Sequence, residues 1–220
     1  MSGIIGSRFN TRGSGLVGSV GTDGQVFTSS GAGTSHTFED AAGGAWNLIS
    51  TLTSDGSDSS LSFTSGIDST YDTYCFQFIN IHAETNNTDL MFQVNASGET
   101  GFNETINSTF FDTYHNEGDT AAALTYVAGW DQANGTAYQN LGVAQGADDS
   151  GVCGYLYLWG PSSTTYNKRF YSRLAHGENL YAKDGFSEGY VNTTAAITQI
   201  DFKMSADEIQ GGKIKMYGIT

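Results

Sequence analysis

The sequence predicts an all-β protein: a β-sandwich, jelly-roll-like in its arrangement, preceded by an extended N-terminal arm. Apolar and polar residues alternate with a period of two in many short runs, which is the pattern of half-buried strands. Turn-forming segments separate these runs every ten to fifteen residues, and the 220 residues include 29 glycines and one proline. The first part of the chain lacks alternation. We therefore assign residues 1–45 to an arm and residues 46–220 to the sandwich.

The arm contains isolated apolar pairs among glycine, serine and threonine. These pairs are Ile4 and Ile5, Leu16 and Val17, and Val26 and Phe27. They are too sparse to form a core, but they could dock into grooves on a partner. Arg8 and Arg12 precede the first acidic residue, so the arm could lie on an acidic neighbour. Two alternatives stay open: the arm packs on its own domain, or its arginines are simply solvated.

Strands are expected from Trp46 onward. Residues 46–49 begin the first, residues 55–58 form a turn, and residues 61–63 form the second. Residues 71–81 form the longest strand, with Tyr74, Phe76 and Phe78 on one face and Ile81 on the other. Alternation resumes over residues 90–94 after a polar segment, which predicts a hairpin spanning residues 74–94.

The second half of the chain holds the clearest strand and a closing hairpin. Weak runs at residues 109–114, 124–130 and 138–143 lead to a strong run at residues 152–159, and further strands are expected at residues 169–174 and 186–191. Ile200, Phe202 and Met204 alternate with polar residues, as do Ile214 and Met216. With Gly211 and Gly212 read as the loop between them, these last runs predict a hairpin with one buried face.

The net charge of −14 is unevenly placed. No Lys or Arg occurs between Gly13 and Asn167, whereas 17 of the 23 acidic residues lie there. Such an acidic body repels nucleic acid and anionic membranes, so we expect neither as a partner. No run approaches the ~20 apolar residues of a membrane span, and the N-terminus does not resemble a signal peptide.

The sequence offers no pattern for catalysis or a cofactor. His36, His82, His115 and His176 are scattered without metal-ligand spacing. Neither a G-x-S-x-G elbow nor a phosphate-binding loop is present, so we expect no enzyme. The acidic turns at residues 55–58 and 148–149 could supply oxygen ligands for a calcium ion, but solvated turns are the simpler interpretation. Cys75 and Cys153 are expected to be reduced core thiols, with a disulfide as the alternative.

The strand at residues 152–159 suggests a surface for self-association. Val152, Leu156 and Leu158 alternate with three large aromatic residues, Tyr155, Tyr157 and Trp159. One of these faces is the core side, so the aromatic face needs a second cover, from another sheet edge or a neighbouring subunit. Three basic residues that follow could offset the repulsion between acidic subunits: Lys168, Arg169 and Arg173. The six polar and aromatic residues named here form a candidate homotrimer interface, although aromatic rings can also stack on sugars.

Several segments resemble virion proteins of tailed bacteriophages of the marine or cyanophage type. The C-terminal run G-K-I-K-M-Y-G-I at residues 212–219 resembles the end of small β-sandwich proteins of these particles. The run G-T-D-G-Q-V-F-T-S-S-G-A-G at residues 21–33 is similar to a segment of phage fibre and virion proteins. Residues 1–18, 63–74 and 161–173 are similar to the same group of proteins, so the resemblance touches most of the chain.

The resemblance implies a non-enzymatic virion structural protein, made in the cytoplasm of the host bacterium. The leading hypothesis is a capsid decoration (cement) protein that docks through its arm, with the major capsid protein or tail components as partners. Phage decoration and fibre proteins are very often threefold, which favours a homotrimer. The alternative is a tail-fibre or spike protein whose sandwich binds a host-surface glycan. A fibre-borne glycan hydrolase is a third, weaker reading, because the resemblance carries no catalytic motif.

Overall fold

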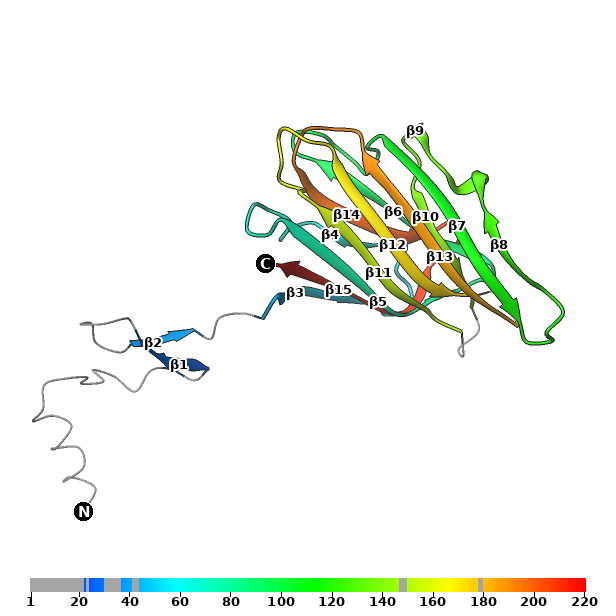
Figure 1. Cartoon of the computed structure of the whole chain (residues 1–220), viewed down its shortest axis with the longest axis horizontal. Helices are drawn as coiled ribbons and strands as arrows, with labels where there is room; N and C mark the ends of the chain where they lie inside the picture. Colours follow the sequence, from blue (N-terminus) through cyan, green and yellow to red (C-terminus); the bar gives the residue numbers. More distant parts are fainter. Residues whose placement is uncertain (1–21, 23, 30–36, 41–43, 147–149, 178–179) are drawn as a thin grey trace, which may run out of the picture. The chain divides into compact units, whose positions relative to one another are not determined.

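The computed structural model describes residues 22, 24–29, 37–40, 44–146, 150–177 and 180–220 (Figure 1). The chain divides into two compact units, Met1–Gly44 and Ala45–Thr220. The described parts of both units contain strands, and the second unit also contains one short 3-10 helix. In chain order these elements are β1 (Gln25–Thr28), β2 (Thr37–Asp40), β3 (Trp46–Thr53), β4 (Leu61–Phe63), β5 (Thr73–Ala83), β6 (Thr88–Ala96), β7 (Ile106–Asn116), β8 (Ala122–Tyr126), η1 (Ala128–Trp130), β9 (Ala133–Gly135), β10 (Gln139–Ala144), β11 (Val152–Trp159), β12 (Lys168–His176), β13 (Tyr181–Val191), β14 (Ile197–Met204) and β15 (Ile209–Ile219).

The N-terminal unit contains an antiparallel pair of strands, β1 and β2. The rings of Phe27 and Phe38 lie 5.2 Å apart across this pair. Val26 and Phe27 are therefore in a paired strand, where the sequence predicted an extended arm and strands only from Trp46 onward. A strand of four residues is too short for alternation to reveal it. Six of the eight arm residues that the sequence singles out lie outside the described residues: Ile4, Ile5, Arg8, Arg12, Leu16 and Val17.

The C-terminal unit is a sandwich of two antiparallel sheets, which confirms the predicted all-β sandwich. A large sheet has the strand order β3-β15-β5-β11-β12-β13-β7-β8, with β9 also paired to β7. A small sheet has the order β10-β6-β14-β4. The two sheets lie one behind the other in the view of Figure 1. The chain passes repeatedly between them, as in a jelly roll, but β11, β12 and β13 follow one another as a meander.

Alternate residues of both sheets meet in one apolar core. Phe202 of β14 contacts rings of the large sheet, with centroids 5.5 Å from Phe76 and 5.2 Å from Phe78. Ile214 and Met216 of β15 are completely buried in the same core. The buried faces predicted for β14 and β15 are therefore confirmed, because period two sends every second side chain toward the opposite sheet.

Both predicted hairpins are wrong, although their strands exist. β5 and β15 belong to the large sheet, whereas β6 and β14 belong to the small one. The short connections are corners between sheets, and each contains a residue with positive φ, 61° at Asn87 and 58° at Asp207. The two corners are bonded to each other, since Glu84 N donates to Glu208 O at 3.1 Å. Alternation of apolar and polar residues shows only that a strand has one buried face. It does not show whether the next strand pairs with it or passes to the other sheet.

The predicted loop at Gly211 and Gly212 is also wrong. Both residues lie within β15, where the pairing register with β5 shifts around them. On the β5 side, Asn80 adopts a positive φ of 48°. These irregularities change the phase of alternation, so Ile81 is completely buried in the core although the sequence placed it on the opposite face.

Candidate binding face

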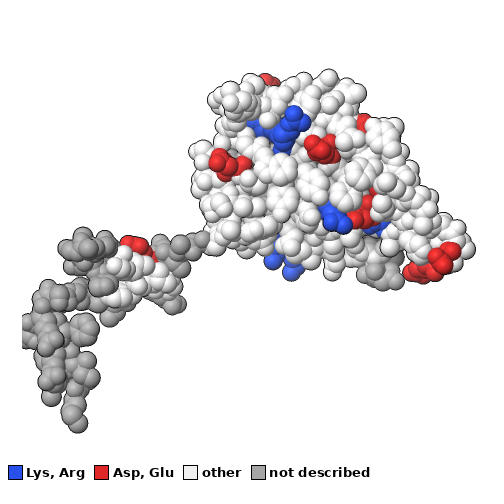
Figure 2. All heavy atoms as spheres, in the orientation of Figure 1, with Lys and Arg blue, Asp and Glu red and all other residues white. Residues whose placement is uncertain are grey.

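The side of the large sheet that points away from the core is the candidate functional site, and we call it the outer face. Antiparallel pairing aligns its side chains in rows that cross the strands. One row joins Tyr217, Cys75, Tyr157 and Tyr171, and the next joins Lys215, Gln77, Tyr155, Arg173 and Phe186. In the view of Figure 2, charged groups are few on this surface, and most of it is uncharged. The outer face is thus a broad, mainly aromatic platform.

Aromatic rings of β3, β15 and β11 form a continuous cluster at one end of the outer face. Tyr157 and Trp159 are stacked with centroids 5.8 Å apart, and Trp46 lies 6.1 Å from Tyr157 and 5.5 Å from Tyr217. Trp46 is 48% exposed, Trp159 39% and the neighbouring Leu48 55%. We call Trp46, Leu48, Tyr157, Trp159 and Tyr217 the aromatic patch. Because Leu156 and Leu158 point into the core, the two predicted faces of β11 are confirmed.

Basic residues are concentrated on the outer face. Its strand positions carry four basic residues and two acidic ones: Lys213, Lys215, Arg169, Arg173, Asp184 and Glu188. The guanidinium of Arg169 lies 5.0 Å from the ring centroid of Tyr190, and that of Arg173 lies 5.0 Å from Phe186. This local excess of positive charge contrasts with the chain's net charge of −14. The face therefore suits an acidic or uncharged partner better than a basic one.

Arg173 and Asp184 form a bidentate ion pair on this face. The Arg173 Nε donates to Asp184 Oδ1 at 3.0 Å, and Nη2 donates to Oδ2 at 2.6 Å. The pair links β12 to β13 and fixes the orientation of the guanidinium against the Asp184 carboxylate. Asp184 also raises the pKa of Arg173, through the hydrogen bonds and the opposite charge. The sequence identified Arg173 but could not identify its partner.

Lys168 does not share the outer face. It is completely buried, and its Nζ donates to the carbonyl oxygen of Thr193 at 3.2 Å. Burial lowers the pKa of Lys168. Along β12 it has the same parity as the buried Phe170 and Ser172, whereas Arg169 points outward. The three basic residues predicted to act together are therefore split between the two sides of the sheet.

The two cysteines are free thiols in the structure. Cys75 lies in the row between Tyr217 and Tyr157 and is buried, which raises its pKa to about 12. Cys153 is partly exposed, and its Sγ donates to Asn80 Oδ1 at 3.2 Å. Burial disfavours the charged form of Cys75, so this thiol is not poised to react as a thiolate near neutral pH.

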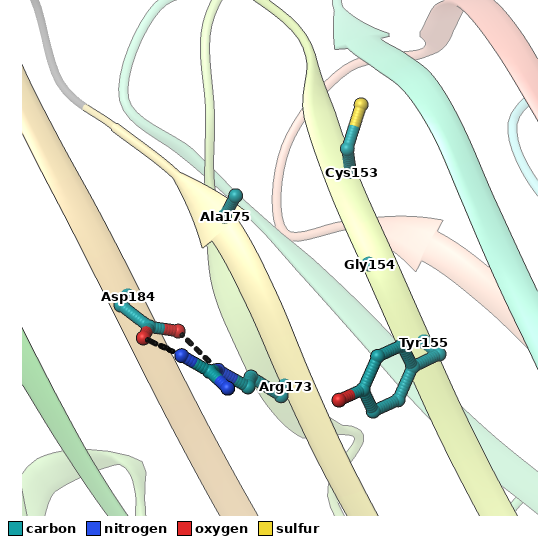
Figure 3. Close-up of a pocket in the computed structure, with 6 residues that line it drawn as sticks. All are labelled: Cys153, Gly154, Tyr155, Arg173, Ala175 and Asp184. Carbon is teal, nitrogen blue, oxygen red and sulfur yellow. Dashed lines mark hydrogen bonds and ion pairs between the residues drawn. The ribbon is translucent and has the colours of Figure 1, made fainter.

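A hollow opens in the outer face at the end of the strands opposite the aromatic patch (Figure 3). Its volume is about 530 Å³, its lining is largely apolar, and its residues are Cys153, Gly154, Tyr155, Arg173, Ala175 and Asp184. The register explains it: the row Cys153, Ala175 and Asp184 has small side chains beside the row of large ones at Tyr155, Arg173 and Phe186. Sequence reasoning missed the hollow because these residues meet only through strand pairing.

Position 154 in β11 requires glycine. Its φ is +152°, and a Cβ there would lie 2.3 Å from the carbonyl oxygen of Arg173. The register with β5 also shifts between Val152 and Gly154, which marks a β-bulge. Because Gly154 is paired with Leu174 and Phe78, whose side chains are buried, a side chain added here would collide with β12.

The acidic turn at Asp55 and one of the histidines, His176, have structural hydrogen-bond partners. Asp55 Oδ1 accepts hydrogen bonds from Ser57 N at 3.0 Å and Ser57 Oγ at 2.8 Å, so this carboxylate stabilises a turn. The pKa of Asp55 is lowered by these bonds. His176 Nδ1 accepts from Val143 N at 3.1 Å, and His36 and residues 148–149 lie outside the described residues. Within the described residues, no three His, Cys, Asp or Glu side chains gather as metal ligands.

Among the described residues, no helix has the length and apolar character needed to cross a membrane. Comparison of the chain with protein-family models, curated proteins and solved structures gave no match. The function is therefore inferred from the chain's own residues.

Proposed function

We propose that the protein is a non-enzymatic structural component of a tailed-phage particle, specifically a decoration protein on the outside of the capsid. The observation that carries this proposal is the division of the chain into a sandwich with its own closed core and a separate N-terminal unit. The resemblance of several segments to phage virion proteins supplies the setting. In this role the N-terminal unit attaches the chain to the shell, and the sandwich is displayed outward.

The described part of the N-terminal unit supports an attachment role. Val26 is 43% exposed and Phe27 49% exposed, so the hairpin keeps apolar groups that a second surface can bury. The preceding segment carries Arg8 and Arg12 and no acidic residue before Asp23. Apolar contacts flanked by positive charge suit docking on an acidic neighbour such as an assembled shell.

Deletion of residues 1–30 is expected to abolish retention on particles while leaving the sandwich folded. The reason is that the core is built from the C-terminal unit. Far-ultraviolet circular dichroism checks the fold, and sedimentation with purified particles measures retention. The double variant Val26→Asp and Phe27→Asp should weaken retention in the same assay without shortening the chain. Co-sedimentation of the truncated protein at full occupancy would show that attachment does not use this unit.

We further propose that the protein forms a homotrimer through the aromatic patch. Exposed aromatic residues at one end of a rigid sheet provide the apolar contact, and the neighbouring basic residues offset repulsion between acidic subunits. Light scattering should give a mass of about 70 kDa, three times the 23.4 kDa chain. Trp159→Glu should shift the mass to the monomer, whereas Thr109→Glu, which adds the same charge at the far side of the outer face, should not. A constant 23.4 kDa mass at all concentrations would exclude the trimer.

A specific observation favours a second candidate, a tail-fibre or spike protein that binds a host-surface glycan. The hollow at Gly154 joins a half-buried tyrosine, Tyr155, to a planar arginine–carboxylate pair, and both kinds of group recognise sugars. Particle retention through the N-terminal unit is expected in either role. The copy number per particle separates the two roles.

A further inference from the structure

We propose that the hollow at Gly154 is a binding site for an uncharged sugar ring, with a second sugar position beside it. The site differs from the aromatic patch, since it lies at the other end of the strands and is lined by other residues. The proposal does not depend on the decoration role. It assigns a ligand class to a surface of the C-terminal unit that the proposed attachment does not use.

The shape and lining of the hollow suit a pyranose. Its volume of about 530 Å³ exceeds that of one sugar ring, and it opens directly to solvent. Gly154 and Ala175 give an apolar floor, and the Tyr155 ring stands at the side (Figure 3). A pyranose presents an apolar face of C–H groups and a rim of hydroxyls. The apolar face can lie on this floor and against the tyrosine ring, while the rim reaches the polar wall.

The polar wall is the Arg173–Asp184 pair. Two of the five guanidinium N–H groups of Arg173 can be assigned to Asp184, one on Nε and one on Nη2, which leaves three donors. Asp184 Oδ2 accepts from both Nε and Nη2 of Arg173, whereas Oδ1 accepts from Nε of Arg173 and retains a lone pair for a further bond. Donor and acceptor therefore lie side by side in one plane. Two adjacent hydroxyls of a sugar match this arrangement, because one can accept from Arg173 while the next donates to Asp184.

The pair also determines the preferred charge of the ligand. Asp184 already neutralises Arg173, so an acidic sugar would gain little from the guanidinium and would be repelled by the carboxylate. A charged protein side chain would likewise be attracted by one member of the ion pair and repelled by the other. An uncharged, hydroxyl-rich ligand keeps the ion pair intact and uses its spare hydrogen-bonding capacity. These features favour a neutral saccharide over an acidic one or a charged peptide.

A second hollow extends the site across the sheet. It has a volume of about 310 Å³ and is lined by Thr113, Tyr114, His115, Ala182, Lys183 and Asp184. Asp184 lines both hollows, so the two are adjacent across this residue. The row that contains the small residues continues from β11 through β12 and β13 to Thr113 of β7. A saccharide of two or more units lying across the strands would occupy both hollows.

The test is a titration of the isotope-labelled full-length protein, followed by two-dimensional ¹H–¹⁵N NMR. The probes are methyl glycosides of glucose, galactose, mannose and N-acetylglucosamine, their disaccharides, and methyl glucuronide as the acidic member. At least one neutral probe should shift the amide signals of Gly154, Tyr155 and Ala175 at millimolar concentration. A neutral disaccharide should bind more tightly than its monosaccharide and also shift Thr113.

Two variants test the location of the site. Ala175→Trp fills the hollow from an exposed position, and Asp184→Asn removes the charged acceptor. Each should weaken binding at least about tenfold, because the ring is excluded or a hydrogen bond to a charged group is lost. Thr51→Trp is the matched control, since it places the same ring elsewhere on the outer face and should leave binding unchanged. Unchanged spectra of both hollow variants outside the hollow confirm that they fold.

Three results would overturn the assignment. They are the absence of shifts with every neutral probe, a preference for methyl glucuronide, and binding that persists in Ala175→Trp. Failure of the assignment would leave the particle-retention result untouched, because retention is measured through deletion of residues 1–30. Conversely, loss of the decoration role would leave the sugar titration unaffected.

Discussion

Met216→Asp is expected to prevent stable folding. Met216 is completely buried in β15, with Phe76 of β5 as its pairing partner on one side and Ser50 of β3 on the other. An aspartate at this position would place an unpaired carboxylate between the two sheets, where the charged form is strongly disfavoured. We expect a loss of more than about 4 kcal/mol in the free energy of unfolding, which is a large share of the stability of a typical domain.

Lys215→Glu is the matched control for this substitution. Lys215 is adjacent in the chain but points to the outer face, so its charge reversal should change the free energy of unfolding by only about 0.5 kcal/mol in either direction. Urea denaturation followed by tryptophan fluorescence measures both variants. Equal losses in the two variants would show that the faces of β15 are assigned incorrectly.

Gly212→Ala is the second substitution with a large expected effect. Gly212 has a φ of +105°, and an added Cβ would lie 2.3 Å from the carbonyl oxygen of Asn80 and 2.7 Å from Ile81 Cα. Both contacts are with the backbone of β5, so no side-chain movement can relieve them. The strain and the overlap together should cost on the order of 3 kcal/mol.

The adjacent Gly211 provides the control. A Cβ added there would meet only the His82 ring, at 3.9 Å, which is an ordinary van der Waals contact. Gly211→Ala should therefore change the free energy of unfolding by no more than about 0.5 kcal/mol. Thermal unfolding of the two variants under the same conditions measures the difference. If Gly211→Ala were as destabilising as Gly212→Ala, the different surroundings assigned to these two glycines would be incorrect.

The sequence predicts strands and their buried faces well, because both follow from local alternation. Phe202, Ile214 and Met216 are buried as their pattern requires. Pairing is harder to predict, because it depends on whether a corner keeps the chain in one sheet or sends it to the other. Alternation in the sequence does not reveal bulges either. The irregularity at Asn80 reverses the side on which Ile81 lies, although the residues around it alternate regularly.

The candidate site was predictable only where it lies on a single strand. Tyr155, Tyr157 and Trp159 share a face because residues two apart always do in a regular strand. The hollow combines β11, β12 and β13, and its shape depends on the register that sets Ala175 opposite Cys153. Lys168 was grouped with Arg169 because they are neighbours in sequence, although neighbours in a strand point to opposite sides.

The central claim is that this protein decorates the outside of a phage capsid, and a reconstruction of the particle that carries it tests this claim most directly. Quantitative mass spectrometry of the same particles supplies the copy number. The account predicts hundreds of copies on the outer surface of the head, each attached through its N-terminal unit with the sandwich facing outward. A few dozen copies confined to the tail would contradict the decoration role and favour the fibre or spike, and absence from the particle would contradict both.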